Sequence, residues 1–433
     1  MLRSPYDREI VTLAFPALGA LAAEPLPALA DTAIVGHLGT TQLAALALAF
    51  AVLTTIFSLF IFLTYGTTAQ VARLHGAGAQ ERAGALAAQG LWLALGVGIT
   101  LAILTAIFAG PIIGLLGGEG ETARLAERYL RIAAIGVPGF FAVLAGQGYL
   151  RGISDLRTPL VILLAGNVAN VVLNVVLVYP AGLGLDGSAI GTVIAQLSMG
   201  AAFVVLLFRA PAATRRPSWT LMKPLVVVGG DLMLRTGALV GSFLVASAVL
   251  ARIGEASLGA HQVAFQLFVF LALVMDAIAI AGQVLVGRML GAGDAEQAFV
   301  AARRMIELSI LAGLLIGAVL LALTSVIPGA FTGDPAVVER AEAIWPLFAL
   351  IQPLGGAVFA LDGILIGAGD TRYLALSMLF AGVCVYVPIA LAALHFEWGI
   401  TGVWVGLVAL MVARLVTLAH RFRGRRWAVV GAT

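Results

Sequence analysis

Residues 73–78 of this chain read Arg73-Leu-His-Gly76-Ala-Gly78, and residues 288–293 read Arg288-Met-Leu-Gly291-Ala-Gly293, which is 215 positions later. The same offset relates Gly152-Ile-Ser-Asp155-Leu-Arg157 to Gly367-Ala-Gly-Asp370-Thr-Arg372. Single residues that keep the offset are Phe50 with Phe265, Pro138 with Pro353, and Gly184, Gly187 and Gly191 with Gly399, Gly402 and Gly406. One constant offset along most of each half indicates an internal duplication.

The stretches between these motifs are too apolar for a water-soluble domain. The 433 residues are 61% hydrophobic and only 11% charged, whereas soluble domains carry about 25% charged residues. Runs long enough to cross a bilayer as a helix, which takes about 20 residues, lie near 10–34, 43–70, 84–109, 124–147, 159–180, 187–208, 224–251, 258–284, 300–326, 340–364, 373–394 and 400–421. These runs are continuous and do not alternate, which favours helices over a β-barrel. We therefore predict an all-α polytopic membrane protein with twelve transmembrane helices.

The duplication predicts how these helices are grouped. Six helices per copy give both copies the same orientation, so we expect two parallel-repeat six-helix lobes with a central cleft, which rock to give alternating access. The predicted N-lobe is residues 1-209 (helices 1–6), and the predicted C-lobe is 224-433 (helices 7–12). Residues 210-223, with two prolines, are the predicted cytoplasmic linker.

The basic residues orient the chain in its membrane. Alternate loops and the C-terminal tail are rich in arginine, and the positive-inside rule then places both termini in the cytoplasm. Lys223 is the only lysine, a bias typical of GC-rich bacterial genomes. We expect a multi-pass protein of the bacterial cytoplasmic (inner) membrane, and the net charge of +3 needs no nucleic-acid partner to explain it.

Asp31 is the first candidate for function, because an ionisable side chain within hydrocarbon is costly and marks a functional site by default. Pro25 and Pro27 precede it, and each removes a helical hydrogen bond and favours a kink. Glu24, seven residues before Asp31, projects from roughly the same helix face and is a second candidate acid. The alternatives are that Asp31 only caps the outer helix end and that Glu24 only pairs with another residue.

Polar side chains on two further predicted helices extend this candidate site. Asn167, Asn170 and Asn174 recur at helical spacing and form one polar stripe. The stripe is interpreted as a cavity wall beside Asp31, or as amides that hold helices together. Thr192 is a polar neighbour in the next predicted helix.

The second half carries a different polar set, formed by Asp231, Arg235, Asp276 and Asp362. Asp231 and Arg235 lie one helical turn apart and can pair. No member of the set has a charged counterpart 215 positions earlier. We predict an internal C-lobe polar network, with a charge cluster that only fixes helix packing as the alternative.

Several motifs together resemble the multidrug and toxic compound extrusion (MATE) family, particularly its DinF branch. They are Pro16 with Pro25-Leu-Pro27-Ala-Leu-Ala-Asp31-Thr-Ala-Ile-Val-Gly36-His-Leu-Gly39, Tyr149-Leu-Arg151-Gly152 with Asp155, Asn170-Val-Val-Leu-Asn174, Gly187-Ser-Ala-Ile-Gly-Thr192 and Gly259-Ala260-His261-Gln262. The resemblance covers almost the whole chain. It implies twelve helices in two lobes and export of drugs or metabolites against a proton or sodium gradient.

One departure from the family pattern bears on the coupling ion. Some prokaryotic members have an aspartate where this chain has Asn174, and an amide does not carry a coupling charge. The coupling then depends on Asp31. Fewer anionic ligands remain for a metal cation, which favours H⁺ over Na⁺.

Other classes of function fit the sequence less well. Gly182-Leu-Gly184-Leu-Asp-Gly187 matches a dinucleotide-binding pattern but joins two membrane helices, and His261 is too isolated for a metal site. We expect no metal, no cofactor besides the coupling ion, and a monomer. The alternatives are a lipid-linked precursor flippase of the same superfamily and, from a different class, a membrane-embedded enzyme that uses Asp31 and Glu24.

Overall fold

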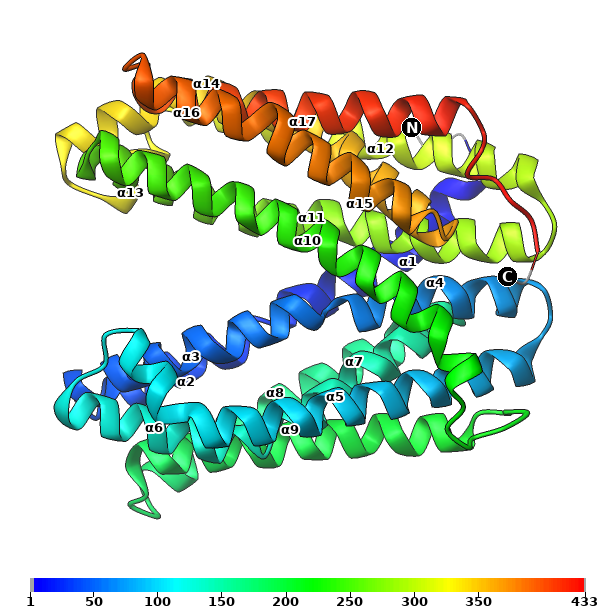
Figure 1. Cartoon of the computed structure of the whole chain (residues 1–433), viewed down its shortest axis with the longest axis horizontal. Helices are drawn as coiled ribbons and strands as arrows, with labels where there is room; N and C mark the ends of the chain where they lie inside the picture. Colours follow the sequence, from blue (N-terminus) through cyan, green and yellow to red (C-terminus); the bar gives the residue numbers. More distant parts are fainter. Residues whose placement is uncertain (1–3, 432–433) are drawn as a thin grey trace. The chain divides into compact units, whose positions relative to one another are not determined.

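The computed structural model describes residues 4–431, and within that range the chain forms helices and no strand. The helices of the first half are α1 (Pro5–Ala23), α2 (Leu26–Gly36), α3 (Thr40–Phe60), α4 (Phe62–Gly76), α5 (Gln80–Leu115), α6 (Gly120–Ala134), α7 (Val137–Gly152), α8 (Arg157–Val178) and α9 (Gly184–Arg209). Those of the second half are α10 (Trp219–Ile253), α11 (Glu255–Gly291), α12 (Ala295–Ala322), α13 (Ile327–Phe331), α14 (Pro335–Gly367), α15 (Thr371–Leu379), the π-helix η1 (Phe380–Tyr386), α16 (Val387–His395) and α17 (Gly399–Arg423). Figure 1 labels the α-helices along the chain.

The helices confirm the predicted fold class. Within the described residues, 11 helical runs are long and apolar enough to cross a membrane. The pair α6–α7, bent by 48°, passes the same test as one broken span and makes 12. The predicted helix near 124–147 is therefore two helices, and the break lies just before Pro138, at the start of α7.

Contacts between Cα atoms divide the chain into two compact units, whose limits differ from the halves of the repeat. Unit 1 contains the described residues up to Leu18 together with Gly230–Gly431, and unit 2 contains Gly19–Gly229. The predicted lobes, 1-209 and 224-433, assign the first 18 residues and the start of α10 differently. Both α1 and α10 therefore begin in one unit and end in the other.

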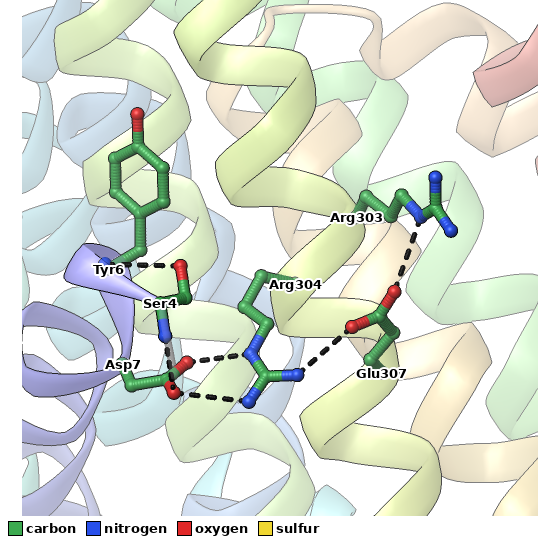
Figure 2. Close-up of polar contacts among 6 residues, drawn as sticks. All are labelled: Ser4, Tyr6, Asp7, Arg303, Arg304 and Glu307. Carbon is green, nitrogen blue, oxygen red and sulfur yellow. Dashed lines mark hydrogen bonds and ion pairs between the residues drawn. The ribbon is translucent and has the colours of Figure 1, made fainter. Parts of the chain in front are cut away.

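The start of α1 is held to the rest of unit 1 by two ion pairs, the first of which, between Asp7 and Arg304, is shown in Figure 2. The guanidinium of Arg304 on α12 donates to both carboxylate oxygens of Asp7, at 2.7 and 3.0 Å, and also contacts Glu307. Asp7 is fully buried. A second pair joins Glu9 to Arg288 at the end of α11. A buried carboxylate needs such a partner, so these pairs fix the first turns of α1 on unit 1.

The segment between α9 and α10 lies against α5 within unit 2. The chain is non-helical from residue 210 to 218, and Gln89 Nε2 donates to the carbonyl of Arg216 at 3.0 Å. Trp92 Nε1 donates to the carbonyl of Arg215 at 2.8 Å. The predicted linker is thus shorter than expected, because α10 already begins at Trp219.

The break between α1 and α2 falls where the two prolines predicted a kink. Pro27 has no N–H with which to reach the carbonyl oxygen of Ala23, four residues earlier. Asn167 on α8 supplies the missing donor: its Nδ2 donates to that oxygen at 2.7 Å. The first amide of the predicted polar stripe thus satisfies a backbone group that the proline leaves unpaired.

Replacing Asn167 by alanine should leave the Ala23 carbonyl buried without a donor and destabilise the protein by about 1–3 kcal/mol. The midpoint of thermal unfolding in detergent measures the loss. In a Pro27→Ala background, where the backbone N–H is restored, Asn167→Ala should lower the stability less. A double-mutant cycle gives the coupling free energy between the two positions. Equal losses of stability in the two backgrounds would contradict the role of Asn167 as the substitute donor.

Candidate functional site

Asp31 lies on α2 and is buried inside unit 2, with 1% of its surface exposed. Asn174 Nδ2 on α8 donates to its Oδ1. The hydroxyl of Thr192 on α9 donates to its Oδ2 at 3.3 Å. Both carboxylate oxygens are therefore accepting hydrogen bonds, from two different helices.

The polar stripe of α8 continues this network. Asn170 Nδ2 donates to the hydroxyl oxygen of Thr192 at 3.0 Å, and Asn174 Nδ2 lies 3.5 Å from Asn170 Oδ1. The structure thus brings together Asp31, Asn170, Asn174 and Thr192, which the sequence had proposed as neighbours. Asn167 belongs to the same stripe, but its amide donates to the Ala23 carbonyl at the break between α1 and α2.

The hydrogen bonds that Asp31 can make depend on whether its carboxyl group is protonated. An ionised carboxylate only accepts hydrogen bonds, whereas a protonated one also donates. Asn174 Oδ1 is buried and has no hydrogen-bond partner among the described residues. Rotation of this amide would turn an acceptor toward a protonated Asp31, where a donor now faces the carboxylate.

Gly191 on α9 makes room for the Asn174 amide. A Cβ atom at position 191 would lie 2.0 Å from Asn174 Oδ1, far inside contact distance. The absence of a side chain there lets α8 and α9 approach closely enough for Asn174 and Thr192 to meet the same carboxylate.

Gly191→Ala should push Asn174 away from Asp31 and cost about 1–3 kcal/mol through overpacking, measured as a lower midpoint of thermal unfolding. Gly96→Ala is the matched control, because a Cβ atom on that helical glycine meets nothing within 4 Å. The control should be neutral or stabilising. Equal midpoints for the two variants would refute the steric role of Gly191.

Glu24 differs from Asp31 in its exposure to solvent. It occupies the break between α1 and α2 and is exposed, as is Pro25, whereas Asp31 is buried. The seven-residue spacing predicted a shared face, but the break interrupts the helical periodicity on which that prediction depended. Pro27, in the first turn of α2, is half-buried.

Two tyrosines near the site were missed by the sequence reasoning. Tyr179 donates its hydroxyl to the carbonyl of Ile34 at 2.8 Å, which ties the end of α8 to α2. Tyr129 on α6 is fully buried. For Tyr179 the available signal was a polar tip at the end of an apolar helix, whereas α6 carries several charged residues, among which Tyr129 does not stand out.

The polar residues of the second half form a separate cluster inside unit 1. Asp362 on α14 accepts from two guanidinium groups, those of Arg235 on α10 and Arg414 on α17. Asp231 accepts from the Thr371 hydroxyl at 2.9 Å. The predicted network thus includes Arg414, which the sequence reasoning did not select, although an arginine inside an apolar run is itself a signal.

Asp276, the fourth predicted member of this set, lies half-buried on α11. Within residues 4–431, no group of three or more His, Cys, Asp or Glu side chains could hold a metal ion. Asp31 is thus surrounded by an amide and a hydroxyl, whereas Asp362 is surrounded by two guanidinium groups.

Comparisons with known proteins agree with this architecture. A family model described as MatE matches the chain twice, at residues 16–176 and 233–396, once in each half. Protein DETOXIFICATION 44, chloroplastic, from Arabidopsis thaliana is 32% identical over 96% of this chain and 82% of its own length. DNA damage-inducible protein F from Escherichia coli (strain K12) is 29% identical over 97% of this chain and 93% of its own.

A solved structure has the same fold. It is described as the outward-facing conformation of a multidrug resistance MATE family transporter of the MOP superfamily. It superposes with a TM-score of 0.86 at 24% sequence identity and covers 98% of both chains.

Proposed function

The chain belongs to the MatE family of membrane transporters, and from this premise we propose that it is a secondary active antiporter. It exports drugs or amphipathic, cationic metabolites in exchange for H⁺ by alternating access. Members of this family are transporters rather than enzymes, so the enzymatic alternative is set aside. The flippase alternative is not favoured, because the solved structure with the same fold is described as a multidrug resistance transporter.

The observation that carries the proposal is the hydrogen-bond network of Asp31. This buried carboxylate is held by one amide and one hydroxyl from neighbouring helices, without a cationic partner among its hydrogen bonds. A carboxylate in such surroundings can take up and release a proton. The amide of Asn174, with its unpaired oxygen, transmits the change to α8.

The same network supports H⁺ over Na⁺ as the coupling ion. A cation site in a protein is assembled from several oxygen ligands, among which carboxylates supply the charge. The hydrogen bonds to Asp31 come from the side chains of Asn174 and Thr192, and neither carries a charge. A proton needs only the single carboxylate.

The arginine-rich loops support an orientation with both termini in the cytoplasm of a bacterial inner membrane. The protein then works as a monomer, because the duplication already supplies two similar halves in one chain. The carboxylate of Asp31 lies toward the outer end of its span in this orientation.

Purified protein in liposomes tests the proposal. An imposed pH gradient, with no sodium present, should drive uptake or release of a fluorescent cationic dye such as ethidium. An imposed sodium gradient at uniform pH should not. Dye movement under the sodium gradient alone would assign the coupling to Na⁺, and movement under neither gradient would contradict antiport.

A further inference from the structure

The helices α1 and α10, which each begin in one compact unit and end in the other, are held at their starts by equivalent positions of the repeat. On α12, Arg304, supported by Glu307, holds the start of α1. On α5, Gln89 and Trp92 lie 215 positions earlier and hold the segment that leads into α10. We call these two pairs the α1 clasp and the α10 clasp.

The two clasps differ in charge. Arg304 donates to both carboxylate oxygens of the fully buried Asp7, at 2.7 and 3.0 Å (Figure 2). Gln89 instead donates to the backbone carbonyl of Arg216 at 3.0 Å and accepts from the backbone N–H of Ser218 at 2.9 Å. Charge-assisted hydrogen bonds are about twice as strong as neutral ones. The α1 clasp is therefore the stronger of the two.

The other end of α1 contacts the helix that carries the Asp31 network. Asn167 on α8 donates to the carbonyl oxygen of Ala23, the last residue of α1. Asn174, about two turns later on the same helix, donates to Asp31. A change in the hydrogen bonds of Asp31 therefore acts on a helix that also holds the end of α1.

Between these two ends α1 is one helix. Its 19 residues span about 28 Å at 1.5 Å per residue. The position equivalent to Asp31 in α10 is Ala246, 215 residues later, which has no group that binds a proton. Only the helix of the first half therefore joins a clasp to a carboxylate at this position of the repeat.

We propose that Asp7 and Arg304 are positioning residues for coupling. Their ion pair fixes the start of α1 on unit 1, so that a movement of α8 caused by proton exchange at Asp31 is passed along α1 to that unit. This inference deepens the proposed function, on which its role in export rests. Neither Asp7 nor Arg304 takes up the exchanged proton.

Hydrogen–deuterium exchange of the detergent-solubilised protein, at one pH, tests this route as a double-mutant cycle. Asp31→Asn is a neutral mimic of the protonated carboxyl group. We expect it to change the amide exchange rate of residues 295–307, the first turns of α12, by about fivefold or more, as is typical of coupled sites. Asp7→Leu keeps the size of the buried side chain and removes the ion pair. In that background Asp31→Asn should leave these rates unchanged.

Controls separate the ion pair from a general loosening of the helices. Arg303→Gln neutralises the neighbour of Arg304, whose side chain is 72% exposed, and the effect of Asp31→Asn should remain. It should remain also in Gln89→Leu, which breaks the α10 clasp at the equivalent position. Asp7→Asn keeps the shape and one acceptor oxygen of the side chain, so it should reduce the effect in part. This variant replaces Asp7→Leu if the latter does not fold.

Transport in liposomes gives a second measurement. Asp7→Leu should still let a cationic dye move down its own gradient, while the number of protons exchanged per dye falls. A pH-sensitive dye inside the liposomes measures the protons. If Asp7 had only a structural role, both fluxes would fall in proportion and their ratio would stay at the wild-type value.

An effect of Asp31→Asn on α12 that persists in full in the Asp7 variants would overturn the proposal. So would the absence of any such effect when Asp7 is present. If the exchange cycle gives the expected result while no gradient drives dye movement, the route through α1 stands and the proposed antiport fails. If proton-driven export is found while the cycle shows no coupling, antiport stands and the positioning role of Asp7 and Arg304 fails.

Discussion

Asp31→Asn should leave the protein folded and inserted while proton-driven export falls to the level of liposomes without protein. An asparagine of the same size still accepts a hydrogen bond but cannot exchange a proton at physiological pH. The Asn174 amide and the Thr192 hydroxyl, which now donate to the carboxylate, would no longer sense a change of charge. Dye export under an imposed pH gradient measures the effect.

The control for this variant is Glu121→Gln, which neutralises an exposed carboxylate that pairs with Arg124 on the same helix. An exposed pair of this kind contributes little to stability, so export should remain near the wild-type rate. The melting temperature of Asp31→Asn should also remain close to that of the wild type. Export at the wild-type rate by Asp31→Asn would contradict the assignment of proton coupling to this carboxylate.

Asp362→Ala should produce the largest loss of stability. The substitution leaves two guanidinium groups, those of Arg235 and Arg414, in the interior of unit 1 without their shared carboxylate. Removing one partner of a buried ion pair costs about 3–5 kcal/mol, because the remaining charge is left uncompensated. We expect low yield in the membrane and early thermal unfolding in detergent.

Arg303→Ala is the control for loss of an ion pair at the surface. The side chain of Arg303 is 72% exposed in its pair with Glu307, and its removal should change the melting temperature little. The triple variant Asp362→Leu, Arg235→Met, Arg414→Leu removes all three charges together and should recover stability. A triple variant as unstable as Asp362→Ala would show that the cost is not electrostatic.

Much of the fold followed from periodic features of the sequence. Continuous apolar runs predicted the spans, and the two prolines before Asp31 predicted where the first span breaks. The stripe from Asn167 to Asn174 was predicted to face Asp31, because residues at helical spacing share a face. The relative positions of residues within one helix depend only on their spacing, so they can be predicted from a single sequence.

The features that escaped prediction depend on how helices rotate and pack. Arg414 joins Asp362 across sequence-distant helices, and no spacing rule relates the two positions. The π-helical turn Phe380–Tyr386 arises inside an apolar run that looks uniform. The bend before Pro138, by contrast, falls where Gly136 and a proline at the start of α7 mark a break. Glu24 is exposed and Asp31 is buried, because the break between α1 and α2 interrupts the helical spacing that relates them.

The passage of α1 from one unit to the other bears on how the duplicated gene arose. The described residues up to Leu18 pack with the second half of the chain, and residues 219–229 pack with the first. A six-helix ancestor that assembled as a symmetric pair would have done the same by swapping its N-terminal segment between protomers. Fusion of two such copies would keep that swap within one polypeptide. Neither half, cut out alone, carries every segment that its own bundle requires.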